Sequence, residues 1–119
     1  MKQLGDSFEG RAIQYLEERG LQVLRRNFRA KTGEIDIVAL AGECLVFVEV
    51  RSRSNTRYGG AAITVDWRKQ RKILRTAAFF LQRHPGLAQL PCRFDVVAFE
   101  PPQSSGEDKV RWIRSAFSA

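Results

Sequence analysis

Two apolar runs on either side of Gly42-Glu43 constrain the fold of this chain more than any other feature. Residues 35–40 and 45–51 are rich in β-branched side chains, which favour strands. Glycine at the first position of a two-residue connection is typical of a tight hairpin turn. The pattern therefore predicts an antiparallel hairpin in which Ala41 pairs with Cys44, and the numbers of all paired residues then add up to 85.

The predicted register brings two carboxylates together. Asp36 falls opposite Glu49, and such side chains have Cβ atoms about 4.5–5.5 Å apart on one sheet face. At about 5 Å and an effective dielectric constant near 20, the repulsion costs about 3 kcal/mol. A divalent cation would offset it, since Mg²⁺ prefers carboxylates and water. Arg51, one pleat further along the face of Glu49, offers a structural ion network instead, and geometry alone leaves both solutions open.

The remaining segments predict helices and strands around this hairpin. Apolar residues at helical spacing predict a first helix, capped by Asp6 and ending near Arg19 before Gly20. A second helix is expected from Thr64 or Asp66 to about Arg83. Short strands are expected over 21–26, 93–99 and 110–113, with loops over 27–33, 52–63 and 101–106. The order α-β-β-β-α-β-β indicates a single α/β domain, residues 1–119, with a mixed central β-sheet flanked by helices.

The net charge of +7 is concentrated in one part of the chain. Residues 51–75 contain eight basic residues and one acidic residue, so they account for all of it. This concentration favours a polyanionic partner, although a solvated helix face would explain it as well. The residues expected to bind nucleic acid are Arg53, Arg57, Arg68, Lys72 and Arg75. The sequence has no signal-peptide pattern and no apolar run of membrane-spanning length, so a cytoplasmic protein without a membrane partner is expected.

Three motifs resemble the signature of the YraN family. They are Gly33-Glu34-Ile35-Asp36-Ile37-Val38, Phe47-Val48-Glu49-Val50-Arg51 and Arg93-Phe94-Asp95-Val96-Val97. That family is similar to Holliday-junction resolvases and belongs to the PD-(D/E)xK nuclease superfamily. The resemblance extends from Gly5 to Trp112. It implies a restriction-endonuclease-like core and a metal-dependent endonuclease that hydrolyses DNA phosphodiesters, with branched DNA as a candidate substrate.

The resemblance also implies a catalytic centre. Glu9, Asp36, Glu49 and the Val50 carbonyl would bind Mg²⁺ or Mn²⁺. In the superfamily a lysine orients and activates the attacking water, whereas Arg51 holds that place here. Arginine stays protonated and cannot be a general base, but it can bind a phosphate oxygen or stabilise transition-state charge. Lys69 is the alternative source of an amine, unless it belongs only to the basic helix surface.

Two other functions stay open at this point. Arg51 in place of lysine favours a catalytically weak or silent nucleic-acid-binding module with the nuclease fold. A scaffold domain with a purely structural ionic core is the third hypothesis. Resolvase-like relatives that dimerise allow a homodimer, although no residue requires one. Asp95 is predicted to form a structural ion pair with Arg93 or a neighbouring residue. Trp67 and Trp112 are predicted to anchor the core or its rim.

Overall fold

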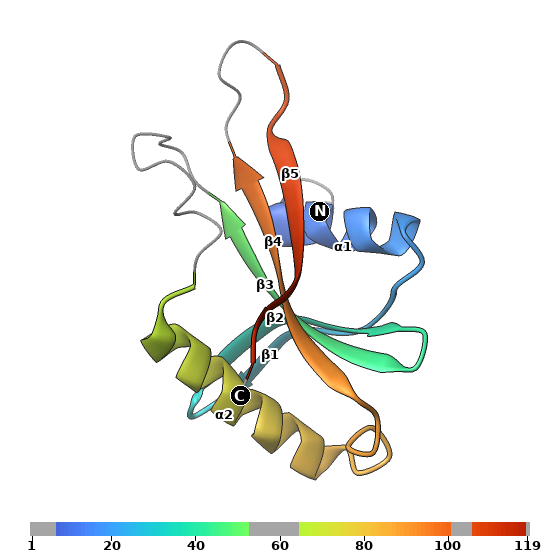
Figure 1. Ribbon diagram of the computed structural model, residues 1–119, viewed down its shortest axis with the longest axis vertical. Helices are drawn as coiled ribbons and strands as arrows, with labels where there is room; N and C mark the ends of the chain where they lie inside the picture. The colour runs from blue at the N-terminus through green and yellow to red at the C-terminus, as the bar shows by residue number, and fades with distance from the viewer. Residues whose placement is uncertain (1–6, 53–64, 101–105, 119) are drawn as a thin grey trace.

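The sequence folds into two helices and a five-stranded sheet in the predicted order (Figure 1). The computed structural model describes residues 7–52, 65–100 and 106–118. The elements are α1 (Phe8–Glu18), β1 (Gln22–Ala30), β2 (Gly33–Ala41), β3 (Cys44–Ser52), α2 (Trp67–Arg83), β4 (Cys92–Glu100) and β5 (Lys109–Phe117). Within these ranges no helix is long and apolar enough to cross a membrane. The predicted class, a mixed α/β sheet flanked by helices, is confirmed.

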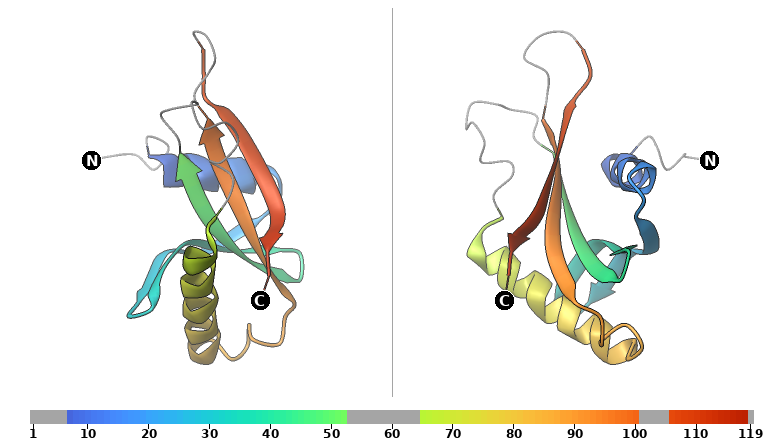
Figure 2. Two further views of the ribbon diagram at one scale, coloured as in Figure 1. Left: turned by 60° about the vertical axis from the view of Figure 1, so that its left-hand side comes forward. Right: turned by 45° about the vertical axis from the view of Figure 1, so that its right-hand side comes forward.

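The sheet is mixed because α2 carries the chain across it between β3 and β4. Those two strands are parallel, while every other neighbouring pair in the order β1-β2-β3-β4-β5 is antiparallel. The helices cover opposite faces of the sheet (Figure 2). Each buries an apolar stripe against it: Ala12, Ile13 and Leu16 from α1, and Ile73, Ala77 and Phe80 from α2.

The helix ends follow the expected chemistry with one correction. Ser7, rather than Asp6, caps α1, because its Oγ accepts a hydrogen bond from the Gly10 N–H at 2.9 Å. Asp6 lies outside the described residues. Asp66 caps α2 by accepting from the Lys69 N–H at 2.9 Å, so the second of the two predicted starts is the observed one. Gly20 follows α1 with φ +93°, as its left-handed role requires.

Both edge strands are longer than the sequence predicts. β1 continues to Ala30 through residues expected to form a loop, and β5 reaches Phe117 instead of stopping near residue 113. About half of the residues in each strand are polar, so the extent of these strands depends on pairing with β2 and β4 rather than on an apolar pattern. Each also contains a residue with positive φ, Asn27 at +55° and Ser115 at +51°, which obscures the alternation of side chains.

The predicted hairpin register is confirmed, and the place where it ends positions the acidic residues. Pairing runs from Ala41–Cys44 to Ile37–Val48. Beyond that pair the strands separate (Figure 1): β2 continues alongside β1, and β3 continues alongside β4. Asp36 and Glu49 are the first residues past this fork, one on each strand.

Candidate active site

Asp36 and Glu49 lie together at the fork between β2 and β3. The main chain of β2 no longer reaches β3 here, and the Asp36 side chain takes its place: Oδ2 accepts a hydrogen bond from the Val50 N–H at 2.8 Å. Glu49 is two residues beyond Phe47 on the α2 side of the sheet, and only 5% of its side chain is exposed. The predicted juxtaposition of the two carboxyl groups is therefore present in the fold.

This arrangement is electrostatically unfavourable for two anions. Burial raises the pKa of Asp36 to about 8, and the negative charge of Glu49, a hydrogen bond with Glu49 and the charge of Glu9 add to the effect. The hydrogen bond from the Val50 N–H opposes the increase. Asp36 accordingly holds a proton at neutral pH unless a cation is present to stabilise its charge.

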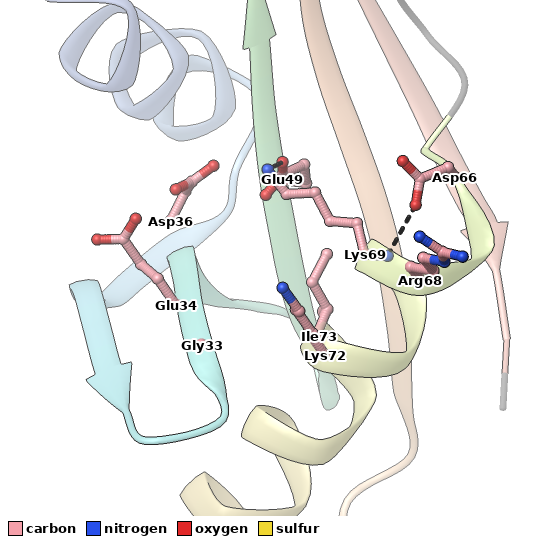
Figure 3. Close-up of a pocket in the computed structure, with 9 residues that line it drawn as sticks. All are labelled: Gly33, Glu34, Asp36, Glu49, Asp66, Arg68, Lys69, Lys72 and Ile73. Atoms are coloured by element: carbon pink, nitrogen blue, oxygen red, sulfur yellow. Dashed lines mark hydrogen bonds and ion pairs between the residues drawn. The ribbon is translucent and has the colours of Figure 1, made fainter.

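Lys69 supplies the positive charge that Glu49 needs. Its Nζ lies 2.7 Å from Glu49 Oε2, and Figure 3 shows the side chain extending from the first turn of α2 towards β3. The Asp66 cap fixes the backbone of that turn at the Lys69 N–H. A carboxylate as buried as Glu49 is costly without such a partner. The structure thus places Lys69, the alternative amine of the sequence analysis, directly at the acidic pair.

Arg51 lies on the same side of the sheet but makes no such contact. It is in register with Ala98, which packs in the core beneath α2. Among the described residues it forms no ion pair with a carboxylate, so the alternative Asp36–Arg51–Glu49 network is not formed there. Lys69 is the partner of Glu49 instead.

Glu9 approaches the pair from the other helix. Its charge contributes to the raised pKa of Asp36, but its Oε1 is held by Arg26 Nε at 3.3 Å. The described part of the chain contains no ready group of three acidic, histidine or cysteine side chains that could hold a metal ion. Asp36 and Glu49 are therefore assembled as a pair, and Glu9 is bound to Arg26 beside them.

A cleft of about 460 Å³ opens over the acidic pair between the sheet and α2 (Figure 3). Its wall on the helix side carries Arg68, Lys69 and Lys72. The other lining residues are Gly33, Glu34, Asp36, Glu49, Asp66 and Ile73. Glu34 Oε2 lies 2.8 Å from Arg29 Nε, so the Glu34 carboxylate is already paired with a cation at the rim of the cleft. The cleft combines an acidic floor with a basic wall.

Gly33, at the start of β2, faces α2 and has a backbone conformation that favours glycine. Its φ of +147° favours glycine, and a Cβ there would lie 3.4 Å from Thr76 Oγ1 and 3.6 Å from Lys72 Cβ. Thr76 Oγ1 also contacts Thr32 Oγ1 at 2.7 Å. This contact ties the hairpin to α2 beside Lys72, which lines the cleft.

The remaining predicted residues are distributed as follows. Arg68 and Lys72 line the cleft, Arg75 is exposed further along α2, and Arg53 and Arg57 lie outside the described residues. Asp95 is fully buried and accepts hydrogen bonds from Arg93, Trp112 and the Ser115 N–H, which confirms its structural role. The prediction for Trp67 is wrong: its side chain is 61% exposed.

Comparison with known proteins places the chain among bacterial relatives of its own length. A model described as "Uncharacterised protein family UPF0102" matches residues 8–99. A UPF0102 protein of Methylobacillus flagellatus is 46% identical over the full length of both chains. One from Stutzerimonas stutzeri is 47% identical over 97% of this chain and 94% of its own, and one from Xanthomonas oryzae is 49% identical over 99% and 93%.

One solved structure also overlaps with this fold. It is SfsA of Pyrococcus furiosus in complex with Ca²⁺, with 18% sequence identity and a TM-score of 0.42. The overlap covers 93% of this chain and 62% of that one.

Proposed function

This chain belongs to the UPF0102 family, the YraN family that its motifs resemble, and on that premise we propose that it is a metal-dependent endonuclease. Its substrate is DNA, with branched structures as the candidate class, and hydrolysis takes place in the cleft between the sheet and α2. The observation that carries the proposal is the acidic pair Asp36–Glu49 at the foot of a basic wall formed by Arg68, Lys69 and Lys72.

The donor set fits a hard divalent cation. Asp36 and Glu49 would hold Mg²⁺ or Mn²⁺ together with the Val50 carbonyl, and Glu9 would join if it exchanged Arg26 for the metal. The raised pKa of Asp36 supports the fit, because a nearby cation would favour the ionised form of this carboxyl group. When bound, the ion would lower the pKa of a water and neutralise charge on the phosphate.

The chain's own residues would position the scissile phosphate. Lys69, fixed by Glu49, would orient the attacking water or stabilise charge that develops on the phosphate oxygens. Arg51 would contact the phosphate from the neighbouring position on β3, and Arg53, Arg57 and Arg75 would extend the basic surface. Arg68 and Lys72 would hold the nucleic-acid backbone by direct charge contacts with its phosphates.

Cleavage of a labelled DNA panel tests the proposal. Branched, flapped, single-stranded and linear substrates are incubated with Mg²⁺, with Mn²⁺ or with a chelator. We expect cleavage only with metal, and a loss of about 10²–10³-fold or more in Glu49→Gln. Glu34→Gln is the matched control, because it neutralises a carboxylate in the same cleft that lies outside the pair; its activity should stay within about twofold of wild type. Binding without cleavage, unaltered in Glu49→Gln, would contradict the nuclease proposal and favour the silent binding module.

Salt dependence of DNA affinity tests the basic wall. We expect the affinity of the wild type to fall steeply with salt, since each phosphate contact releases condensed counterions. Replacing both Arg68 and Lys72 with alanine should reduce the slope of log K against log salt by about 1.8 on duplex DNA, at about 0.9 per lost contact. Arg83→Ala, at the opposite end of α2, is the control and should leave the slope unchanged. Equal slopes for the double variant and the wild type would exclude the cleft as the contact surface.

A further inference from the structure

Trp67 is the most exposed large hydrophobic residue in the described part of the chain, and the proposed chemistry does not use it. It is the first residue of α2, and 61% of its side chain is exposed, against 37–41% for Phe8, Leu24 and Phe79. Leaving an indole in water forgoes the hydrophobic stabilisation that burial would give. Exposed aromatic side chains of this size are instead typical of binding surfaces.

The surroundings of Trp67 are basic and adjoin the cleft. Its neighbours in sequence, Asp66 and Arg68, both line the cleft over the acidic pair. The guanidinium carbons of Arg68 and Arg71 each lie 5.7 Å from the centre of the indole ring. Both guanidinium groups lie over the ring, within the distance of a cation–π contact. Even with these two cations over it, most of the Trp67 side chain remains exposed.

This combination matches the chemistry of an unpaired nucleotide. Any of the nucleobases can stack on an aromatic side chain, and the phosphates of the nucleotide can pair with neighbouring arginines. Bases inside a duplex are stacked on one another and cannot reach such a side chain, whereas bases at single-stranded segments, flaps and junctions can. A protein partner would find the same indole, but the two flanking arginines and the basic wall beside them favour a polyanion.

We propose that Trp67 is a stacking residue for an unpaired base, and that it gives this protein a preference for single-stranded or branched nucleic acid over continuous duplex. The inference rests on the proposed function, because it assumes that nucleic acid enters the cleft next to Trp67. Arg68 and Arg71 hold the phosphates on either side of the stacked base.

Binding of Trp67→Ala to a single-stranded oligonucleotide and to a duplex of the same length tests this inference. Stacking contributes about 1–3 kcal/mol per base, so we expect single-strand affinity to fall by about 5- to 150-fold and duplex affinity by less than about twofold. Trp67→Phe should retain part of the affinity. Titration of the wild type with single strand should also quench its tryptophan emission, and this response should be lost in Trp67→Phe, in which Trp112 remains.

Phe79→Ala is the matched control, because Phe79 is another exposed aromatic residue on α2 with an arginine, Arg83, 5.5 Å from its ring. It lies near the far end of the helix and should leave both affinities unchanged. The inference would be overturned if Trp67→Ala bound the single strand as tightly as wild type, or if it lost the same affinity for both substrates. The proposed function would still stand in either case, provided that the protein showed metal-dependent cleavage. A wild type that binds neither substrate at low salt would overturn both.

Discussion

Replacing Lys69 with methionine will lower the rate of the proposed metal-dependent cleavage by about 10²–10³-fold, whereas Arg51→Met will lower it by about tenfold or less. The reason is geometric: the Lys69 ammonium lies 2.7 Å from Glu49, while Arg51 has no carboxylate partner in the described residues. A charge fixed at the reacting centre stabilises a transition state more than a charge that must first be positioned. Single-turnover cleavage of the preferred substrate measures both rates.

Metal affinity separates the role of Lys69 from that of the acidic pair. Methionine keeps much of the volume of lysine but cannot pair with Glu49, so it removes a cation that competes with metal for this carboxylate. Lys69→Met should therefore bind Mn²⁺ at least as tightly as wild type by calorimetry, while Glu49→Gln should bind it more weakly. If Lys69→Met cleaves at the wild-type rate and Arg51→Met does not, Arg51 has the role that its place in the motif implies.

The acidic pair could be located from the sequence because it depends on local rules. A two-residue turn at Gly42-Glu43 fixes the register of the hairpin, and the observed pairing follows it to Ile37–Val48. The opposition of Asp36 and Glu49 follows from that register. What the register could not show is the fork itself, because the separation of β2 from β3 depends on how β1 and β4 pair with them.

The partner of Glu49 could not be located with the same certainty. Arg51 is two residues away on the same strand, whereas Lys69 comes from a helix on the far side of a long connection, and only packing brings it near. The signal that could have found it is the cap: Asp66 three residues before Lys69 starts the helix and fixes that turn. The exposure of Trp67 could not be predicted, because an indole among charged residues at the start of a helix has no apolar pattern around it that distinguishes a buried side chain from an exposed one.

Asp36→Asn will make the metal-free protein more stable at pH 8.5, although it removes a proposed metal ligand. Burial and the neighbouring acids raise the pKa of Asp36 from 3.8 to about 8, so the native state holds a proton that the unfolded state releases above pH 4. Between these values the native state binds more protons, and stability must fall as pH rises from about 4 to about 8. Above pH 8 the loss is complete. Asparagine does not titrate and retains an oxygen that can accept from the Val50 N–H.

The full pKa shift of Asp36 corresponds to a loss of at most about 6 kcal/mol in the free energy of unfolding, at about 1.4 kcal/mol per pKa unit. Because the carboxyl group retains some exposure, we expect a gain of about 3 kcal/mol for Asp36→Asn at pH 8.5 and almost none at pH 4. Urea denaturation at the two pH values, with chelator present, measures both differences.

Added Mg²⁺ or Mn²⁺ should then stabilise the wild type at pH 8.5 and leave Asp36→Asn nearly unaffected, because a ligand stabilises a protein when it binds the native state and not the unfolded state. Glu34→Gln is the control for removing a carboxylate from the same cleft. It should show neither the gain in stability at pH 8.5 nor the loss of stabilisation by metal. An Asp36→Asn variant no more stable than wild type at pH 8.5 would mean that the pair is not strained, and would remove the electrostatic argument for a cation. A carboxylate that weakens its own fold is best explained by a function that requires its charge.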